Sequence, residues 1–202
     1  LTMPEEINRM VTDSLADYMF TTSEVANRNL VRQGAVLMEN KNIKNLSSSK
    51  NENDAKTELQ KILFNYTTEA LQKFKEENIQ VDFVQIGNEI TNGILFPYGT
   101  IKEKGSDVQK FYDLASVLKE GINATRKIFP ESKIILHIDS SGDLNRCLWW
   151  FSCAEKSNLD YDIIGLSYYS LWQGKDLTQL ENCVKTLSKK FDKGIFIVET
   201  AY

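Results

Sequence analysis

The fold is decided by the stretch Val84–Ile90, VQIGNEI, in which an apolar and β-branched run ends in a glycine, an amide and a carboxylate. A buried parallel strand delivers polar side chains in this way to the open end of an α/β barrel. A second run of this kind, Gly194–Thr200 (GIFIVET), carries Glu199 near its end. Two glutamates at the carboxyl ends of two buried strands, Glu89 and Glu199, are the minimum equipment for cleaving a glycosidic bond with retention of configuration.

Helical and strand patterns alternate along the chain from Asp54 to Tyr202. Apolar residues at helical spacing predict a helix that begins at Asp54, as its N-cap, and stops at Asn78. Further helices are expected over about Val108–Phe129 and Leu177–Phe191, and one between them carries Leu144, Leu148, Trp149, Phe151 and Ala154. Strands are expected over Val81–Gly87, Lys133–Ile138, Ile163–Tyr169 and Gly194–Thr200. Strands that alternate with single helices form βαβ units, so the predicted fold class is α/β with an all-parallel sheet.

The first 53 residues do not continue this pattern. Met3–Tyr18 and Ser23–Met38 could form two helices, and Lys41–Asn53 is a polar stretch that is typical of a linker. A complete eight-stranded barrel needs about 250 residues, and no strand is predicted before Val81. We therefore expect a partial (β/α)8 barrel over residues 54–202, preceded by a helical or irregular segment over residues 1–53 that is not part of the barrel.

The composition argues for one globular domain and against two classes of partner. With 42% hydrophobic and 26% charged residues among 202, the chain can bury a sizeable core. Its net charge of −4 argues against nucleic acid, because proteins that bind it neutralise phosphates with a basic face. No apolar run approaches the length of about 18 residues that a membrane span requires, so no membrane partner is expected. No signal peptide is visible in the sequence.

Cysteine and histidine usage gives no indication of a metal site. Cys147, Cys153 and Cys183 lack the paired spacing of metal ligands, and His137 is the only histidine in the chain. Cys147 and Cys153 lie six positions apart on one predicted helix, which puts their Cα atoms beyond disulfide reach. We therefore predict free cysteines in the core or on the surface, and neither a metal nor another cofactor.

Glu89 and Glu199 are the candidate catalytic residues. For Glu89 to act as general acid and base, burial and the charge of a nearby nucleophile should raise its pKa. Glu199 lies on an apolar strand, where a charge is costly unless it has a partner or a function, and it is the candidate nucleophile. Asn88 is expected to hydrogen-bond a sugar hydroxyl. In the structural alternative, Glu89 caps the next loop and Glu199 is a salt-bridged carboxylate at the rim of the barrel.

His137 and Asp139 are candidates for binding sugar hydroxyls. They lie two positions apart at the end of one strand, so their side chains point the same way, toward the mouth of the predicted barrel. The alternative for His137 is a core histidine whose nitrogens are satisfied by hydrogen bonds.

The next strand ends in a group of hydroxyls and aromatic rings. Ser167, Tyr168 and Tyr169 offer hydroxyl groups to a sugar, and Trp172 follows in the loop beyond. Aromatic faces stack on the apolar side of pyranose rings, so Trp172 is expected to line a sugar cleft. Its alternative is a rim residue that only packs.

The stretch from Asp54 to Tyr202 resembles the endo-β-1,4-galactanases of glycoside hydrolase family 53, the arabinogalactan-degrading enzymes. The family is a (β/α)8 barrel, so the resemblance implies that this chain contains strands four to seven of such a barrel. Matching pieces follow one another in the family's order and spacing: Tyr66–Lys75, Val84–Ile90 with Asn92, Gly93 and Pro97, Leu136–Asp139, Asp162–Tyr169 with Trp172 and Gly174, and Val198–Tyr202.

The resemblance also implies roles for residues. The family's acid/base is the glutamate of the Gly-Asn-Glu motif on strand four, which corresponds to Glu89. Its nucleophile is the glutamate that ends strand seven, which corresponds to Glu199. The implied protein is secreted, is a monomer when complete, and degrades galactan or arabinogalactan. Ser170 and Gln173 depart from the family, which usually has a proline and a histidine at these positions.

Strands one to three and strand eight of the family barrel have no counterpart in this sequence, so we expect the isolated chain to hydrolyse galactan poorly. Two alternatives are open. A β-mannanase or β-glucanase of the same clan would share the glutamate geometry. A carbohydrate-binding barrel fragment would lack catalysis, although the intact Asn88, Glu89 and Glu199 argue against simple degeneration.

Overall fold

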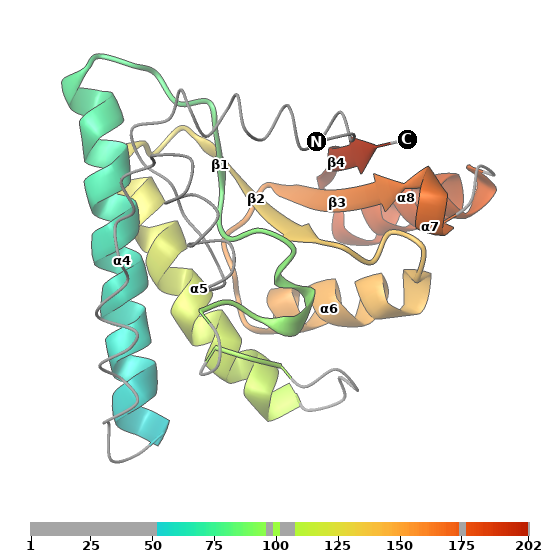
Figure 1. Ribbon diagram of the computed structural model, residues 1–202, viewed down its shortest axis with the longest axis horizontal. Helices are drawn as coiled ribbons and strands as arrows, with labels where there is room; N and C mark the ends of the chain where they lie inside the picture. The colour runs from blue at the N-terminus through green and yellow to red at the C-terminus, as the bar shows by residue number, and fades with distance from the viewer. Residues whose placement is uncertain (1–51, 96–98, 102–107, 174–176, 202) are drawn as a thin grey trace, which may run out of the picture. The chain divides into compact units, whose positions relative to one another are not determined.

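A computed structural model of the chain describes residues 52–95, 99–101, 108–173 and 177–201 (Figure 1). The helices and the polar stretch predicted for residues 1–51 lie outside these ranges. In chain order the elements are α4 (Glu52–Glu76), β1 (Phe83–Gln85), the short 3-10 helix η1 (Ile90–Asn92), α5 (Val108–Ile128), β2 (Lys133–Ile138), α6 (Leu144–Lys156), β3 (Ile163–Tyr169), α7 (Ser170–Gln173), α8 (Thr178–Phe191) and β4 (Gly194–Ala201).

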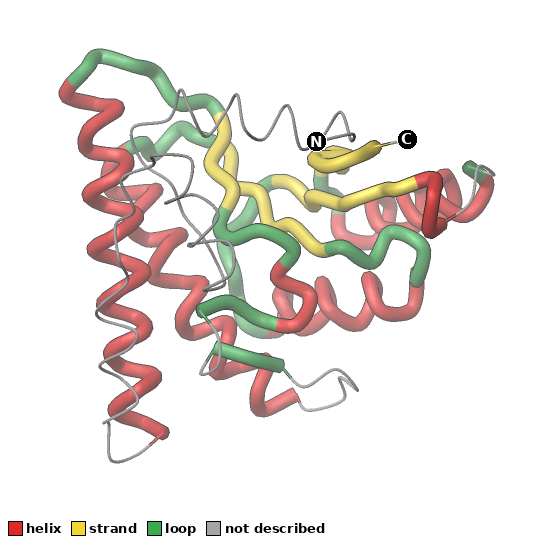
Figure 2. The backbone as a smooth tube through the Cα atoms, in the orientation of Figure 1, coloured by secondary structure: helices red, strands yellow, loops and turns green. Residues whose placement is uncertain are grey.

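The four described strands form one parallel sheet in the order β1-β2-β3-β4, as the sequence predicts. Helices connect successive strands and cover one face of the sheet (Figure 2). This sequential βαβ order is that of a (β/α)8 barrel, of which the sheet is one half. All four strands therefore present their carboxyl ends at the same edge of the sheet. None of the described helices is long and apolar enough to cross a membrane.

The first described helix differs from the prediction at its start and agrees at its end. The predicted N-cap is wrong: α4 begins at Glu52, so Asp54 lies inside the first turn, because no helix-breaking residue precedes it. Asn78 stops the helix in a left-handed conformation (φ 58°), and the Ile79 N–H closes the end by donating to the Phe74 carbonyl at 2.8 Å.

β1 is shorter than the predicted strand Val81–Gly87. Its regular pairing covers Phe83–Gln85 and continues for one more hydrogen bond, from the Ile86 N–H to the Ile135 carbonyl at 3.0 Å. Gly87 then adopts a positive φ of 79°, which a strand does not tolerate and which turns the chain toward Asn88 and Glu89.

The hydrophobic core lies between the sheet and helices α5, α6 and α8. Trp150 on α6 is fully buried and packs edge-on against Phe111 of α5, with ring centroids 5.1 Å apart. Cys147, Cys153 and Cys183 are free and buried, so of the two places predicted for them, core or surface, they occupy the core.

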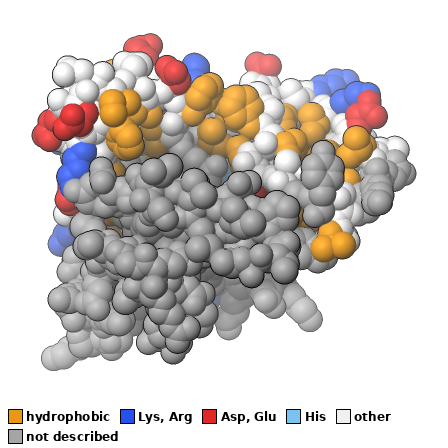
Figure 3. Space-filling view, turned by 45° about the horizontal axis from the view of Figure 1, so that its top comes forward, with side chains coloured by type: hydrophobic (Ala, Val, Ile, Leu, Met, Phe, Trp, Pro, Cys, Tyr) orange, Lys and Arg blue, Asp and Glu red, His pale blue; other side chains and the backbone are white. Residues whose placement is uncertain are grey.

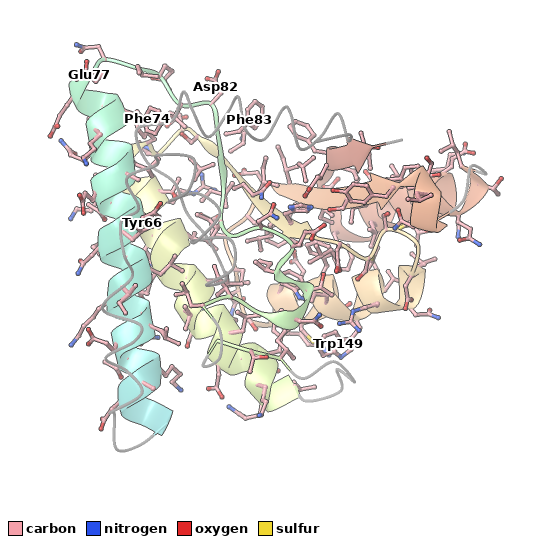
Figure 4. The ribbon with its side chains drawn as sticks, in the orientation of Figure 1. Tyr66, Phe74, Glu77, Asp82, Phe83 and Trp149 are labelled. Carbon is pink, nitrogen blue, oxygen red and sulfur yellow. The ribbon has the colours of Figure 1, made fainter. Side chains whose placement is uncertain are left out.

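The opposite, inner face of the sheet carries exposed aromatic rings near the amino ends of its two edge strands. Phe83 on β1 and Phe196 on β4 are 49% and 39% exposed, although their ring centroids lie only 5.3 Å apart. Figure 4 labels Phe83 where β1 begins, and Figure 3 shows hydrophobic side chains gathered on this side of the described surface. In a closed barrel this face is packed with side chains from all eight strands.

Candidate active site

The site lies at the carboxyl ends of the strands, and Glu89 reaches it through an unusual backbone conformation. Glu89 caps η1 with φ 47° and ψ 50°, in the left-handed region. A non-glycine residue held there costs about 1–2 kcal/mol, and such conformations cluster at functional sites. The conformation places the Glu89 N–H 3.4 Å from His137 Nδ1, to which it donates.

Glu199 approaches the same point from the other edge of the sheet. It lies on β4 directly opposite Ser167 of β3, just after an irregularity in the β3–β4 register. The Tyr169 hydroxyl donates to Glu199 Oε1 at 2.6 Å. One oxygen of the half-buried Glu199 is thereby held in place.

The two glutamates and His137 converge. One oxygen of Glu89, one oxygen of Glu199 and one ring nitrogen of His137 all lie within 4.8 Å of one another. The structure thus places both candidate catalytic carboxylates at one end of the sheet and in mutual reach. The carboxyl groups of retaining glycosidases lie about 5–5.5 Å apart, and those of inverting enzymes about 6.5–9.5 Å apart. The oxygens of Glu89 and Glu199 that lie nearest one another are closer than the separation typical of inverting enzymes.

His137 lies beneath the carboxylates on the inner face of the sheet. It is 1% exposed, and its Nε2 lies 2.8 Å from Ser167 Oγ. Its Nδ1 lies 3.2 Å from Gln85 Nε2 and 3.1 Å from Asn88 Oδ1. The sequence left two roles open for this histidine. The ring is buried and hydrogen-bonded, as the core alternative describes, and it lies on the face of the sheet that carries Glu89 and Glu199.

The electrostatics of the site favour a protonated Glu89 and a neutral His137. Burial raises the pKa of Glu89, the hydrogen bond from Ser167 Oγ (2.7 Å) lowers it, and the charges of Glu199 and Asp139 raise it further. Burial lowers the pKa of His137, against the attraction of Glu199 and Asp139. A carboxyl group that keeps its proton to higher pH suits a general acid.

The other residues predicted to bind sugar differ in their exposure. Asp139 is exposed, and its carboxylate accepts hydrogen bonds from Thr91 Oγ1 and, at 2.9 Å, from Ser140 Oγ. Asn88 is also exposed beside Glu89. Tyr168 is 8% exposed, and the strand pleat directs it to the opposite face of β3 from Ser167 and Tyr169. The predicted role of Trp172 concerns a side chain outside the described part of the structure.

Sequence reasoning missed several residues that organise the site. Gln85 Nε2 donates to the Gly87 carbonyl at 2.9 Å and reaches His137. Its signal was a polar residue between Val84 and Ile86 in an apolar strand. Gln173 bridges two loops: its Oε1 accepts from the Tyr169 N–H at 2.7 Å, and its Nε2 donates to Ser141 Oγ at 2.8 Å.

A polar hollow of about 480 Å³ opens at the carboxyl end of β2, where Asp139 borders it. Its lining combines acidic, amide and guanidinium groups from η1, the loop after β2, α6 and α7: Asn92, Asp139, Ser140, Gly142, Asp143, Arg146 and Gln173. Such groups can hydrogen-bond the hydroxyls of a sugar.

Glu89, His137 and Glu199 have donor atoms close enough to hold a metal ion. Both nitrogens of His137 already have hydrogen-bond partners, and each glutamate accepts from a hydroxyl group. The chemistry of this donor set is therefore explained by hydrogen bonding, and we assign no metal to it.

The sequence of this chain is similar to those of known proteins. Residues 48–202 match the model of Glycosyl hydrolase family 53. The chain is 38% identical over 146 residues to the "Uncharacterized protein in bgaB 5'region" of Niallia circulans, covering 72% of this chain and 40% of that protein. It is 34% identical over 150 residues to the "Arabinogalactan endo-beta-1,4-galactanase" of Cellvibrio japonicus, covering 72% of this chain and 38% of that protein.

A solved structure gives the same result. The "Ignisphaera aggregans GH53 catalytic domain" matches with a TM-score of 0.65 and 32% identity, over 73% of this chain and 38% of that one. This chain spans about two fifths of the length of the curated relatives named above.

Proposed function

Because the chain belongs to glycosyl hydrolase family 53, we propose that it carries the acid/base and the nucleophile of a retaining endo-β-1,4-galactanase. The proposed substrate is galactan or arabinogalactan, in keeping with the Cellvibrio japonicus relative that is named an arabinogalactan endo-β-1,4-galactanase. The single observation that carries the mechanism is the approach of Glu89 and Glu199 to within 4.8 Å. This close approach of one oxygen from each carboxylate supports direct attack by a carboxylate, since inverting sites hold their carboxyl groups about 6.5–9.5 Å apart.

The proposed reaction has two steps. Glu199 attacks the anomeric carbon of the galactosyl unit while Glu89 gives its proton to the oxygen of the leaving sugar, which forms a galactosyl-enzyme. Glu89, now ionised, takes a proton from water as that water attacks the anomeric carbon and releases Glu199. The hydrogen bond from Tyr169 to Glu199 Oε1 leaves Oε2 available for the attack.

Sugar recognition is proposed for groups that line the open part of the site. Asn88 and Asp139 are exposed at the strand ends, and Asp139 also borders the polar hollow. Trp172 is proposed to supply the stacking face. No sugar contact is proposed for Tyr168, because its side chain is buried and directed away from the carboxylates.

Other aspects of the proposal follow from the substrate. A polysaccharide is too large to cross a membrane, so we propose that the protein acts outside the cell. The described strands supply half of a barrel, and the remaining strands are proposed to complete a monomeric enzyme. Neither a cofactor nor a nucleic acid takes part in this chemistry.

The function is tested in a family chimera, in which residues 48–202 replace the matching segment of the Cellvibrio japonicus galactanase. We expect the chimera to hydrolyse unbranched β-1,4-galactan within about 100-fold of its parent, the loss that a misplacement of about 1 Å can cause. Release of reducing sugar from galactan, β-1,4-mannan and β-1,4-glucan is measured in parallel.

Each alternative has its own outcome in this assay. Activity on mannan or glucan without activity on galactan would identify another glycanase of the same clan. A folded chimera that binds galactan in affinity electrophoresis without turnover would show that the segment only binds carbohydrate.

A further inference from the structure

Glu89 is connected to itself by a ring of hydrogen bonds that passes through two other side chains. Its backbone N–H points at His137 Nδ1 (3.4 Å), His137 Nε2 lies 2.8 Å from Ser167 Oγ, and Ser167 Oγ lies 2.7 Å from Glu89 Oε1. His137 and Ser167 are each 1% exposed, so neither presents its polar atoms to solvent. Buried polar groups of this kind hydrogen-bond one another, because a buried donor or acceptor without a partner destabilises the fold.

The directions of these hydrogen bonds follow from the backbone. An amide N–H can only donate, so its hydrogen bond to His137 Nδ1 needs that nitrogen bare, whereas the acceptor Asn88 Oδ1, 3.1 Å away, favours a hydrogen on it. Gln85 Nε2, a second donor, lies 3.2 Å from the same nitrogen. In a neutral imidazole the hydrogen then sits on Nε2 and is donated to Ser167 Oγ. Ser167 must therefore aim its own hydrogen at Glu89 Oε1.

We infer that His137 and Ser167 are positioning residues that fix the Glu89 carboxyl group and reserve its Oε2 atom for the proton that is transferred. Oε1 accepts the hydrogen bond of the Ser167 hydroxyl. That hydroxyl cannot turn away, because Ser167 Oγ is itself hydrogen-bonded to Nε2 of the His137 imidazole. This inference rests on the proposed function for the role of Glu89 as acid and base. It gives His137 and Ser167 the role of positioning Glu89, whereas the sequence suggested that they contact the substrate.

Charged groups around the hydrogen-bonded ring act on the pKa of Glu89, and the bond from Ser167 opposes their effect. The described titratable groups that act on Glu89 or its neighbours are Asp139 after β2, Glu199 on β4 and Tyr169 on β3. Both carboxylates raise the pKa of Glu89, and the Ser167 hydroxyl is the group that lowers it. Ser167 therefore counters the negative field at the one carboxyl group that must gain and lose a proton.

The test uses the 202-residue chain labelled with ¹⁵N, because its only histidine gives an unambiguous signal. Long-range ¹H–¹⁵N correlation spectra distinguish a protonated ring nitrogen from a bare one. At neutral pH we expect a neutral ring with the hydrogen on Nε2, which titrates below the usual range of a histidine because burial lowers its pKa. A hydrogen on Nδ1, donated to Asn88 Oδ1 at 3.1 Å, would overturn the inference.

Ser167→Ala supplies a second readout, the titration of the Glu89 carboxyl carbon, whose signal is identified by its loss in Glu89→Gln. We expect the titration midpoint to rise in Ser167→Ala and to stay unchanged in Tyr161→Phe, which removes a hydroxyl–carboxylate bond, to Glu155, outside the ring. An unchanged midpoint in folded Ser167→Ala would contradict the inference. If that variant does not fold, the tautomer of His137 in the unaltered chain still tests the inference. Neither measurement needs substrate or turnover, so failure of the galactanase proposal leaves both results readable.

Discussion

Replacing Glu199 by glutamine in the family chimera is expected to reduce kcat/KM on galactan by about 10⁴-fold or more, equivalent to about 5.5 kcal/mol or more. Glutamine keeps the size of the side chain and can still accept the Tyr169 hydrogen bond seen at 2.6 Å. It lacks the charge that attacks the anomeric carbon, so no galactosyl-enzyme forms. The measurement is initial-rate kinetics on unbranched β-1,4-galactan.

The matched control for this change is Glu181→Gln on α8. Glu181 pairs with Lys185 at the surface and its side chain is 62% exposed, so its replacement should leave the rate unchanged. Full activity in folded Glu199→Gln would exclude the proposed nucleophile.

Replacing Glu89 by glutamine is expected to reduce kcat/KM on galactan by about 10²- to 10⁴-fold, the range of general acid catalysis. The loss should be much smaller for formation of the galactosyl-enzyme from an aryl galactoside with an acidic phenol, because that leaving group needs no proton. Added azide should then restore turnover, since it attacks the galactosyl-enzyme without a general base. An equal loss on both substrates, with no rescue by azide, would assign Glu89 a structural role.

The pH profile provides a further readout for Glu89. The general acid works only while protonated, so kcat/KM falls as pH rises through the pKa of Glu89. Burial and the charges of Glu199 and Asp139 raise this pKa, against the effect of Ser167, so the alkaline fall should lie above the usual range of a glutamate. Glu89→Gln should abolish this alkaline fall in kcat/KM. The control Glu181→Gln should retain it.

Much of the fold could be predicted because the buried strands are nearly free of polar residues. The bounds of β2 and β3 are those read from the sequence, and α5 and α8 start and stop within one residue of their predicted ends. β1 was predicted too long because pattern alone does not show that Gly87 has already left the strand with φ 79°. The same limit applies to the start of α4, where the polar residues before Asp54 give no periodic signal.

The candidate site could be predicted as a set of residues but not as a network. Strand ends identified Glu89, His137, Ser167 and Glu199, since parallel strands meet at one edge of the sheet. Their pairing depends on contacts between distant residues, such as the 78 positions that separate Glu89 from Ser167. The left-handed backbone of Glu89, which aims its N–H at His137, also leaves no trace in composition or spacing.

The central claim, that Glu89 and Glu199 form a retaining glycosidase site, is tested most directly by the configuration of the first product. Proton NMR during the first minutes of galactan hydrolysis by the chimera shows which anomer is released before mutarotation mixes the two. The 4.8 Å approach of the two carboxylates predicts the β-anomer, formed by two successive displacements at the anomeric carbon. Initial release of the α-anomer would mean a single displacement by water, and would contradict the roles of both glutamates.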